Sequence, residues 1–439
     1  MRIDRIDLWH VEVPLRGAFY PSWIPGFPQT ENRFTLIRLR TASGLEGWSA
    51  GSAMGREREG IGSLLGPYLL GERADDVAGI RQRLREMSYL GLRLGWIEAA
   101  CWDVIGKARA LPVWRVLAPD APTGGEVKLY RSSGQVRSGT DHARYIEEAL
   151  RQGFDTVKLR VHAATLEEDL RAMREARQAV VGAVRLGVDA NQAWRVAVVD
   201  DVPAWTHARA LTFCNEMHQL GFDWVEEPLA MDDYDGLAKL RAATEVDLTG
   251  GELNNQGLPE FGVMLEKRCY DVYQPDAVFT GGIGETWQII QRVKAAGARY
   301  TPHTWTNGIG FAINLQLYAA SPWRADSKLE YPDDGAWAPE ARDGLLVEPF
   351  LHRGGKLALP MAPGLGFAID ERQLKRHGHH FFTATKLRMS LAALRDKGLK
   401  TALELGARRD ARLAQRSAAL DAMAARGEDP VTEGTSGER

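Results

Sequence analysis

The stretch from Lys158 to Glu252 decides the fold predicted for this chain. With the residues leading into it, this stretch contains four strand-like runs, and each run ends in charged or polar residues: FDTVKLR (154–160), VRLGVDANQ (184–192), FDWVEEP (222–228) and VDLTGGE (246–252). Between the runs lie segments of helical period, such as LEEDLRAMREARQAVVG (166–182) and YDGLAKLRAAT (234–244). Strands that alternate with helices favour a parallel sheet with helical crossovers.

Three acids at the ends of these runs, Asp189, Glu226 and Glu252, indicate a metal site. In a parallel barrel all strands open their C-terminal ends on one face, so acids far apart in sequence can converge there. Converging carboxylates repel one another unless a cation lies among them, and Mg²⁺ prefers oxygen ligands. We therefore predict a Mg²⁺ site. The alternative is three separate surface acids, each stabilising the N-terminus of the helix that follows.

These acids and the runs after them resemble the mandelate racemase branch of the enolase superfamily. Later runs end in Gln274-Pro275-Asp276, Thr301-Pro302-His303 and Leu329-Glu330, and Gly281-Gly282 follows the first of them. The segment 96–117, WIEAACWDVIGKARALPVWRVL, is similar to the same family. The resemblance runs from near residue 1 to about residue 370. It implies an α/β fold, a modified (β/α)8 barrel with an N-terminal α+β capping domain.

The domain organisation expected from this resemblance has four parts. They are a capping domain with substrate loops (1–125), the barrel with its metal site (126–345), a return to the capping domain (346–375), and a helical extension with a disordered tail (376–439). The family pattern does not cover the extension. Its Leu and Ala positions repeat at helical spacing, which favours packing on a neighbouring subunit over a solvated appendage.

Composition limits the possible partners and compartments. A net charge of −3 gives no reason to expect nucleic acid or an anionic membrane as a partner, and 44% hydrophobic residues allow a large core. The N-terminus alternates like a strand instead of resembling a signal peptide, and no apolar run reaches eighteen residues. Cys101, Cys214 and Cys269 are expected to be buried thiols in a reducing cytoplasm. The family resemblance also implies a homo-oligomer.

A catalytic dyad is predicted at His303 and Asp276. Histidine has an unperturbed pKa near ~6.5, which suits proton transfer near neutrality, and a carboxylate beside it fixes the tautomer. The alternative is a structural histidine. The resemblance implies that His303 removes the proton next to a substrate carboxylate, while Mg²⁺ stabilises the ene-diolate that forms.

Arg160 departs from the family pattern. Racemases of this family usually carry Lys-x-Lys on the second barrel strand, with the second lysine as a base, whereas this chain has Lys158 and Arg160. A guanidinium has a pKa above about 12 and cannot serve as that base. A two-base racemase needs one base on each face of the substrate, whereas this chain keeps only the base on the His303 face. Elimination needs one base, so we predict a sugar-acid dehydratase that forms a 2-keto-3-deoxy acid. A racemase, epimerase or cycloisomerase that uses Lys158, and a non-catalytic binding protein, are the alternatives.

The remaining site residues follow from the resemblance and from loop placement. Glu330 is implied to stay protonated and to hydrogen-bond to the ene-diolate, or else to be a salt-bridged acid. Glu227 is expected to pair with a cation behind the metal ligands. Two loops, 16–33 and 51–60, are expected to fold over the barrel as lids, or else to be exposed connections. The predicted substrate-binding residues are Asn191, Trp23, Arg56, Arg58 and Trp305.

Overall fold

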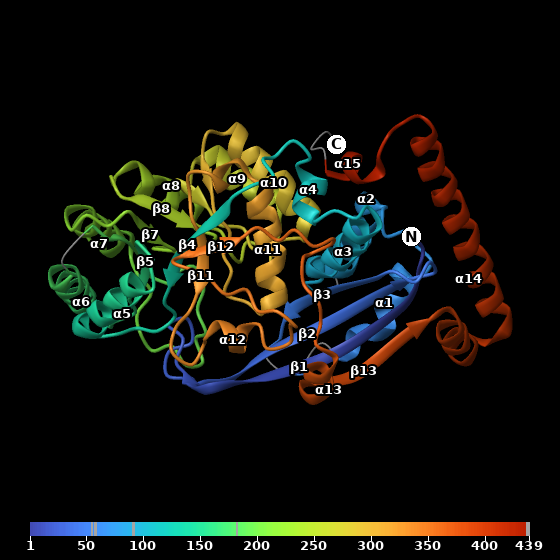
Figure 1. The fold of residues 1–439 in the computed structure, drawn as a ribbon, viewed down its shortest axis with the longest axis horizontal. Helices are drawn as coiled ribbons and strands as arrows, with labels where there is room; N and C mark the ends of the chain where they lie inside the picture. Colours follow the sequence, from blue (N-terminus) through green and yellow to red (C-terminus); the bar gives the residue numbers. More distant parts are fainter. Residues whose placement is uncertain (54–55, 57–58, 90–92, 181–182, 436–439) are drawn as a thin grey trace.

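The chain folds around two β-sheets, one in the capping domain and one in the barrel (Figure 1). The computed structural model describes residues 1–53, 56, 59–89, 93–180 and 183–435. No helix within these described ranges is long and apolar enough to cross a membrane. The three cysteines are buried free thiols.

The capping domain is built on an antiparallel sheet with the strand order β13-β1-β2-β3. Its strands are β1 (Ile3–Phe19), β2 (Gln29–Thr41), β3 (Glu46–Ser52) and β13 (Gly378–Thr385). Its helices are η1 (Glu59–Ile61), α1 (Gly62–Leu69), α2 (Val77–Ser88), η2 (Gly95–Ile97), α3 (Glu98–Ala108) and α4 (Val113–Leu117). Helix α3 packs so closely on β3 that a Cβ at Gly47 would collide with the carbonyl oxygen of Ala100. Only glycine fits at that contact.

All eight barrel strands expected from the sequence are present, which confirms the fold class. They are β4 (Glu126–Ser132), β5 (Thr156–Arg160), β6 (Arg185–Asp189), β7 (Trp224–Glu226), β8 (Asp247–Gly250), β9 (Val272–Tyr273), β10 (Arg299–Tyr300) and β11 (Leu329–Pro332). Neighbours pair in parallel in the order β10-β9-β8-β7-β6-β5-β4-β11. Between β10 and β11, threonine side chains make the connection: Thr301 Oγ1 donates to Lys328 O at 2.9 Å, and Thr304 Oγ1 donates to Glu330 O at 3.0 Å.

Helices on the outside of the barrel alternate with its strands (Figure 1). They are α5 (Gly139–Arg151), α6 (Leu166–Ala179), α7 (His207–Gln219), α8 (Tyr234–Ala242), α9 (Leu258–Lys267), α10 (Ile283–Ala295) and α11 (Gly308–Ala320), with the 3₁₀ turn η3 (Pro322–Arg324) before β11. Local sequence starts several of them, as in the capping box of Thr165 and Glu168 at α6. Directly after β11, the short α12 (Pro339–Arg342) lies where the last barrel helix is expected, so that helix is modified.

The chain then returns along the barrel to the capping domain. Strand β12 (Lys356–Ala358) pairs antiparallel with β4. Farther on, Gly364 O accepts from Val113 N at 2.9 Å, and Leu365 N donates to Asp103 Oδ1 at 2.9 Å. Helix α13 (Glu371–His377) leads into β13. These contacts join the return segment to helices α3 and α4.

The C-terminal extension differs from the expected helix and disordered tail. Residues 378–385 form strand β13, which pairs with β1, before the long helix α14 (Lys386–Ala425) begins. Helix α14 is interrupted at Gly398, where φ is 77°. Its second half packs on the capping domain of its own chain, where Arg416 binds Asp76 at 2.6 Å. The expected disordered end was wrong for Pro430–Thr435, which form helix α15 around the buried Val431.

Candidate active site

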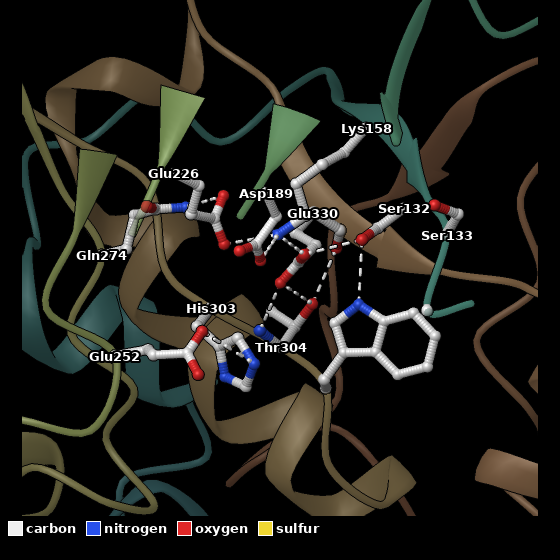
Figure 2. A network of polar contacts seen from close by, with 12 residues as sticks. Ser132, Ser133, Lys158, Asp189, Glu226, Glu252, Gln274, His303, Thr304 and Glu330 are labelled. Carbon is white, nitrogen blue, oxygen red and sulfur yellow. Dashed lines mark hydrogen bonds and ion pairs between the residues drawn. The ribbon is translucent and has the colours of Figure 1, made fainter. Parts of the chain in front are cut away.

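Polar side chains from seven of the barrel strands, or from the residues just after them, converge at one end of the barrel (Figure 2). They are Lys158, Arg160, Asp189, Glu226, Glu252, Asp276, His303 and Glu330, and all of them are buried. Strand register explains the convergence, because Asp189 lies opposite Arg160 on one side and Glu226 on the other. The sequence-predicted catalytic and metal residues therefore lie together at the C-terminal ends of the strands.

Lys158 lies at the centre of the buried acids. Its Nζ is 2.5 Å from Glu226 Oε1, 2.6 Å from Glu330 Oε1 and 3.7 Å from Asp189 Oδ2. Burial by itself lowers the pKa of a lysine, but Glu226 and Glu330 outweigh it and raise the pKa of Lys158 above its ordinary value. Lys158 is therefore a charged ion-pair partner in this arrangement.

Arg160 is held in place by hydrogen bonds and by two aromatic rings. Its Nη1 binds Asp189 and donates to Asn191 Oδ1 at 3.2 Å, and its Nε donates to Ser133 O at 2.7 Å. The guanidinium carbon lies 5.5 Å from the ring centroid of Trp23 and 5.6 Å from that of Trp305, within cation–π range. Arg160 thus presents a permanent positive charge at the position where the family resemblance predicts a second base.

His303 and Asp276 form the expected hydrogen-bonded pair. His303 Nδ1 is 2.9 Å from Asp276 Oδ2, and His303 Nε2 is 3.3 Å from Glu252 Oε2. Burial disfavours the charged ring, yet Glu252 and the hydrogen bond to Asp276 raise the pKa of His303 to about 9. The ring is an imidazolium in this arrangement, with one nitrogen oriented by Asp276 and the other held by Glu252.

The expectation that Glu330 is protonated was wrong for this arrangement. Burial by itself raises the pKa of the carboxyl group, but Lys158 and then His303 lower the pKa of Glu330 to about 2. The carboxylate also accepts from Ser132 Oγ and from Thr304 N, each at 2.8 Å (Figure 2). Glu330 is the salt-bridged acid of the alternative interpretation.

Glu227 also differs from the expectation that it pairs with a cation. Its Oε2 is buried and has no hydrogen-bond partner among the described residues. The reason is local: β7 ends at Glu226, and the backbone of Glu227 turns into the left-handed region at φ 49°, so strand alternation no longer sets its direction. Burial, and after it the nearby Glu252 and Asp189, raise the pKa of Glu227 well above its usual value.

The donor set of Asp189, Glu226 and Glu252 fits a hard divalent cation. All three supply buried carboxylate oxygens from consecutive strand ends, and the neighbouring Glu227 has a buried oxygen, Oε2, with no hydrogen-bond partner among the described residues. The three carboxylates do not yet surround one point: no group of three metal-capable side chains occurs among the described residues. The cations Lys158, Arg160 and His303 hold the carboxylates apart, so binding a metal requires the acids to turn.

Beside this cluster lies a cavity of about 80 Å³. It is lined by Trp23, Arg160, Asn191, Trp194, Glu252, Leu253, Phe279, His303 and Trp305. Three predicted substrate-binding residues, Trp23, Asn191 and Trp305, are therefore at the cavity. Arg56 is not among its lining residues and is exposed, 3.7 Å from Glu59, while Arg58 lies outside the described residues.

Several contacts in the site involve residues that sequence reasoning missed. Gln274 Nε2 donates to Glu226 Oε2 at 3.0 Å, and Trp305 Nε1 donates to Ser132 Oγ at 2.9 Å. In the loop 16–33, Ser22 Oγ donates to Asn191 Oδ1 at 2.5 Å. Ser132 and Gln274 lie at the ends of their strands, as the predicted acids do. That position was the available clue, but neither residue type by itself indicates catalysis.

Known proteins share this architecture. The family described as enolase C-terminal domain-like matches residues 141–373, and the mandelate racemase / muconate lactonizing enzyme N-terminal domain matches residues 14–118. Arabinonate dehydratase of Saccharolobus solfataricus is 27% identical over 79% of this chain and 91% of that protein. D-galactarolactone cycloisomerase of Agrobacterium fabrum is 26% identical over 77% and 89%, respectively.

Solved structures agree with the family matches. The structure of L-talarate/galactarate dehydratase from Salmonella typhimurium LT2, liganded with Mg and L-lyxarohydroxamate, gives a TM-score of 0.72 at 24% identity, over 87% of this chain and 94% of that one. This likeness shows a common fold. Because one family match alone spans more than half of the chain, the protein belongs to the enolase superfamily, in its mandelate racemase branch.

Proposed function

We propose that this protein is a Mg²⁺-dependent dehydratase of a sugar acid. It removes the proton α to the carboxylate and eliminates the β-hydroxyl, which gives a 2-keto-3-deoxy acid. The observation that carries the proposal is Arg160, a permanent cation fixed at the position where a second base would stand. Two of the relatives are named as dehydratases of sugar acids, arabinonate dehydratase and L-talarate/galactarate dehydratase.

The metal fits the acids described above. Asp189, Glu226 and Glu252 would hold Mg²⁺, and a bound ion supplies positive charge that stabilises the substrate carboxylate as its α-carbon loses a proton. Lys158 and Arg160 would then be free of part of their pairing with these acids, and they can bind substrate oxygens.

His303 carries out both proton transfers. If Glu252 served as a metal ligand, His303 Nε2 would lose its ion pair, and the imidazolium would give its Nε2 proton to solvent. Nε2 of the neutral ring, which borders the cavity, would then accept the α-proton. Asp276 keeps the proton on Nδ1 throughout. As the bond from the β-carbon to its hydroxyl breaks, the imidazolium returns the proton to the departing oxygen. Water leaves, and the enol that remains becomes the 2-keto acid.

A second candidate function is a racemase, epimerase or cycloisomerase. It is favoured by Lys158, which is buried within the site, and by relatives such as D-galactarolactone cycloisomerase and N-succinyl-L-Arg/Lys racemase. The ion pairs of Lys158 with Glu226 and Glu330 oppose it, because a base must first lose its proton. A non-catalytic binding protein needs neither the buried dyad nor these ion pairs.

The proposal is tested with a panel of acids in deuterated water with Mg²⁺. The panel contains D-gluconate, arabinonate, galactarate and L-talarate, the acids named by the dehydratase relatives, together with other mono- and diacid sugars. The expected result is a 2-keto acid from at least one member. If the α-proton exchanges with inversion of configuration and no 2-keto acid forms, the racemase becomes the preferred function in place of the dehydratase. If no acid exchanges or reacts, the enzymatic proposal fails.

A further inference from the structure

Behind the dyad lies a buried amide that sequence reasoning did not single out. Asn314 is on α11 and is fully buried. Its Nδ2 donates to Asp276 Oδ1 at 2.7 Å and to Gly310 O at 3.2 Å, and its Oδ1 accepts from Ala277 N at 3.0 Å. The amide orientation is fixed by its partners, because a carboxylate cannot donate to the oxygen and a backbone N–H must donate. One side chain thus binds both the Asp276 carboxylate and the backbone beside it.

Asp276 needs such a support because no strand holds it. Strand β9 ends at Tyr273, so Asp276 lies in the loop before α10. Its Oδ1 accepts from Asn314 and from Val278 N at 2.8 Å, which leaves Oδ2 directed at His303 Nδ1, 2.9 Å away. The carboxylate plane, and with it the direction of the imidazole ring, is therefore set from α11.

We infer that Asn314 is a positioning residue of the His303–Asp276 pair. It fixes Asp276 so that Oδ2 accepts from Nδ1–H, and this keeps Nε2 of His303 directed toward Glu252 and the cavity. The catalytic consequence rests on the proposed function, in which His303 moves the proton. The hydrogen-bond chain from Asn314 through Asp276 to His303 does not depend on it. Removal of the partners that orient metal-binding histidines typically changes affinity or activity about 10–100-fold, and we expect an effect of the same order here.

Gln316 offers a matched control on the same helix. It is also a fully buried amide, two residues farther along. Its Oε1 accepts from Trp114 N at 2.7 Å, and its Nε2 donates to Leu365 O at 3.0 Å. These bonds join α11 to the capping domain and to the return segment, so Gln316 holds structure without touching the dyad. N314L and Q316L each remove a buried amide of α11, and only the first removes a contact to Asp276.

The experiment compares N314L, N314D and Q316L with the unchanged protein. N314D preserves the size of the side chain and the acceptor for Ala277 N but removes the amide donor to Asp276, so it tests the role even if N314L folds poorly. The primary readout is ¹⁵N NMR of histidine-labelled protein with Mg²⁺, in which the His303 ring is assigned by its loss in H303Q. We expect the His303 Nδ1 resonance to move in both Asn314 variants and to stay in place in Q316L.

A second readout uses any acid that the panel turns over. In the Asn314 variants kcat falls about 10–100-fold with little change in KM, whereas Q316L retains kcat. The inference is overturned if N314L and Q316L change the His303 resonance and kcat equally. It is also overturned if neither variant changes them. The NMR measurement needs no substrate. If the panel shows no turnover, the proposed function fails but the positioning role of Asn314 does not. If an acid turns over and the Asn314 variants are unaffected, the positioning role fails but the proposed function does not.

Discussion

Replacing Lys158 with methionine should destabilise the protein strongly when divalent ions are absent. Lys158, Glu226 and Glu330 are all essentially inaccessible to solvent, and Nζ is within 2.6 Å of an oxygen of each acid. Removing one partner of a buried ion pair typically costs about 3–5 kcal/mol, because the remaining charge stays buried without compensation. Methionine preserves the length of the side chain, so the loss comes mainly from the charge. In a chain of 439 residues that loss corresponds to a decrease in Tm of roughly 3–5 °C.

The assay is thermal unfolding of K158M and of the unchanged protein, each in EDTA and in excess Mg²⁺. Because Nζ no longer competes for the carboxylates, we expect Mg²⁺ to raise Tm more in K158M. An ion present at 100 times its Kd adds about 2.7 kcal/mol. Lys107 provides the control: it lies 2.7 Å from Asp103, is partly exposed, and is distant from the predicted ligands in the chain. K107M should lose less stability and should not respond to Mg²⁺. Equal melting of K158M and the unchanged protein in EDTA would refute the reasoning.

Four further predictions follow from other parts of the structure. H303N should lower kcat by about 10²–10⁴-fold while Mg²⁺ still raises Tm, since it removes the base and no metal ligand; an unaffected kcat contradicts the assignment. Burial lowers the pKa of His142 to about 3, so its contribution to stability is complete above pH 6.5 and is lost as pH falls, by about 2 kcal/mol at pH 5. The H142N variant should therefore show a flatter dependence of stability on pH in denaturant titrations. Deleting residues 386–439 removes the bond from Arg416 to Asp76 and uncovers the capping domain, and should lower Tm; an unchanged Tm means that the extension does not support the fold. Helix α14 carries six exposed leucines, and Leu391 is one of them, at 56% exposure. If these leucines form the contact between two copies in the expected homo-oligomer, L391E should lower the mass measured by light scattering.

Much of the fold could be predicted from the sequence because the patterns that specify it are local. Runs of strand-like residues separated by helical segments predicted a parallel sheet, the family resemblance implied the barrel, and each of those runs became a parallel strand. The positions of Asp189 and Glu226 at the ends of their runs indicated one shared face, since parallel strands in a barrel all point the same way. The strand β13 could not be predicted in this way. Its pairing with β1 joins residues more than 360 positions apart, and a local pattern carries no information about such a partner.

The sequence by itself determined which charged groups meet in the site: the acids, the His303–Asp276 pair, and an arginine where a second base is usual. Only the tertiary structure decided which of these groups form ion pairs and hydrogen bonds with one another. It placed Lys158 between Glu226 and Glu330, which keeps Glu330 ionised. It also left Oε2 of Glu227 without a hydrogen-bond partner among the described residues and put Asn314 behind Asp276. The physical reason is that a strand-end position fixes where a side chain starts, whereas burial and distances of a few ångströms determine its charge and its hydrogen bonds. Those distances exist only after the barrel has closed.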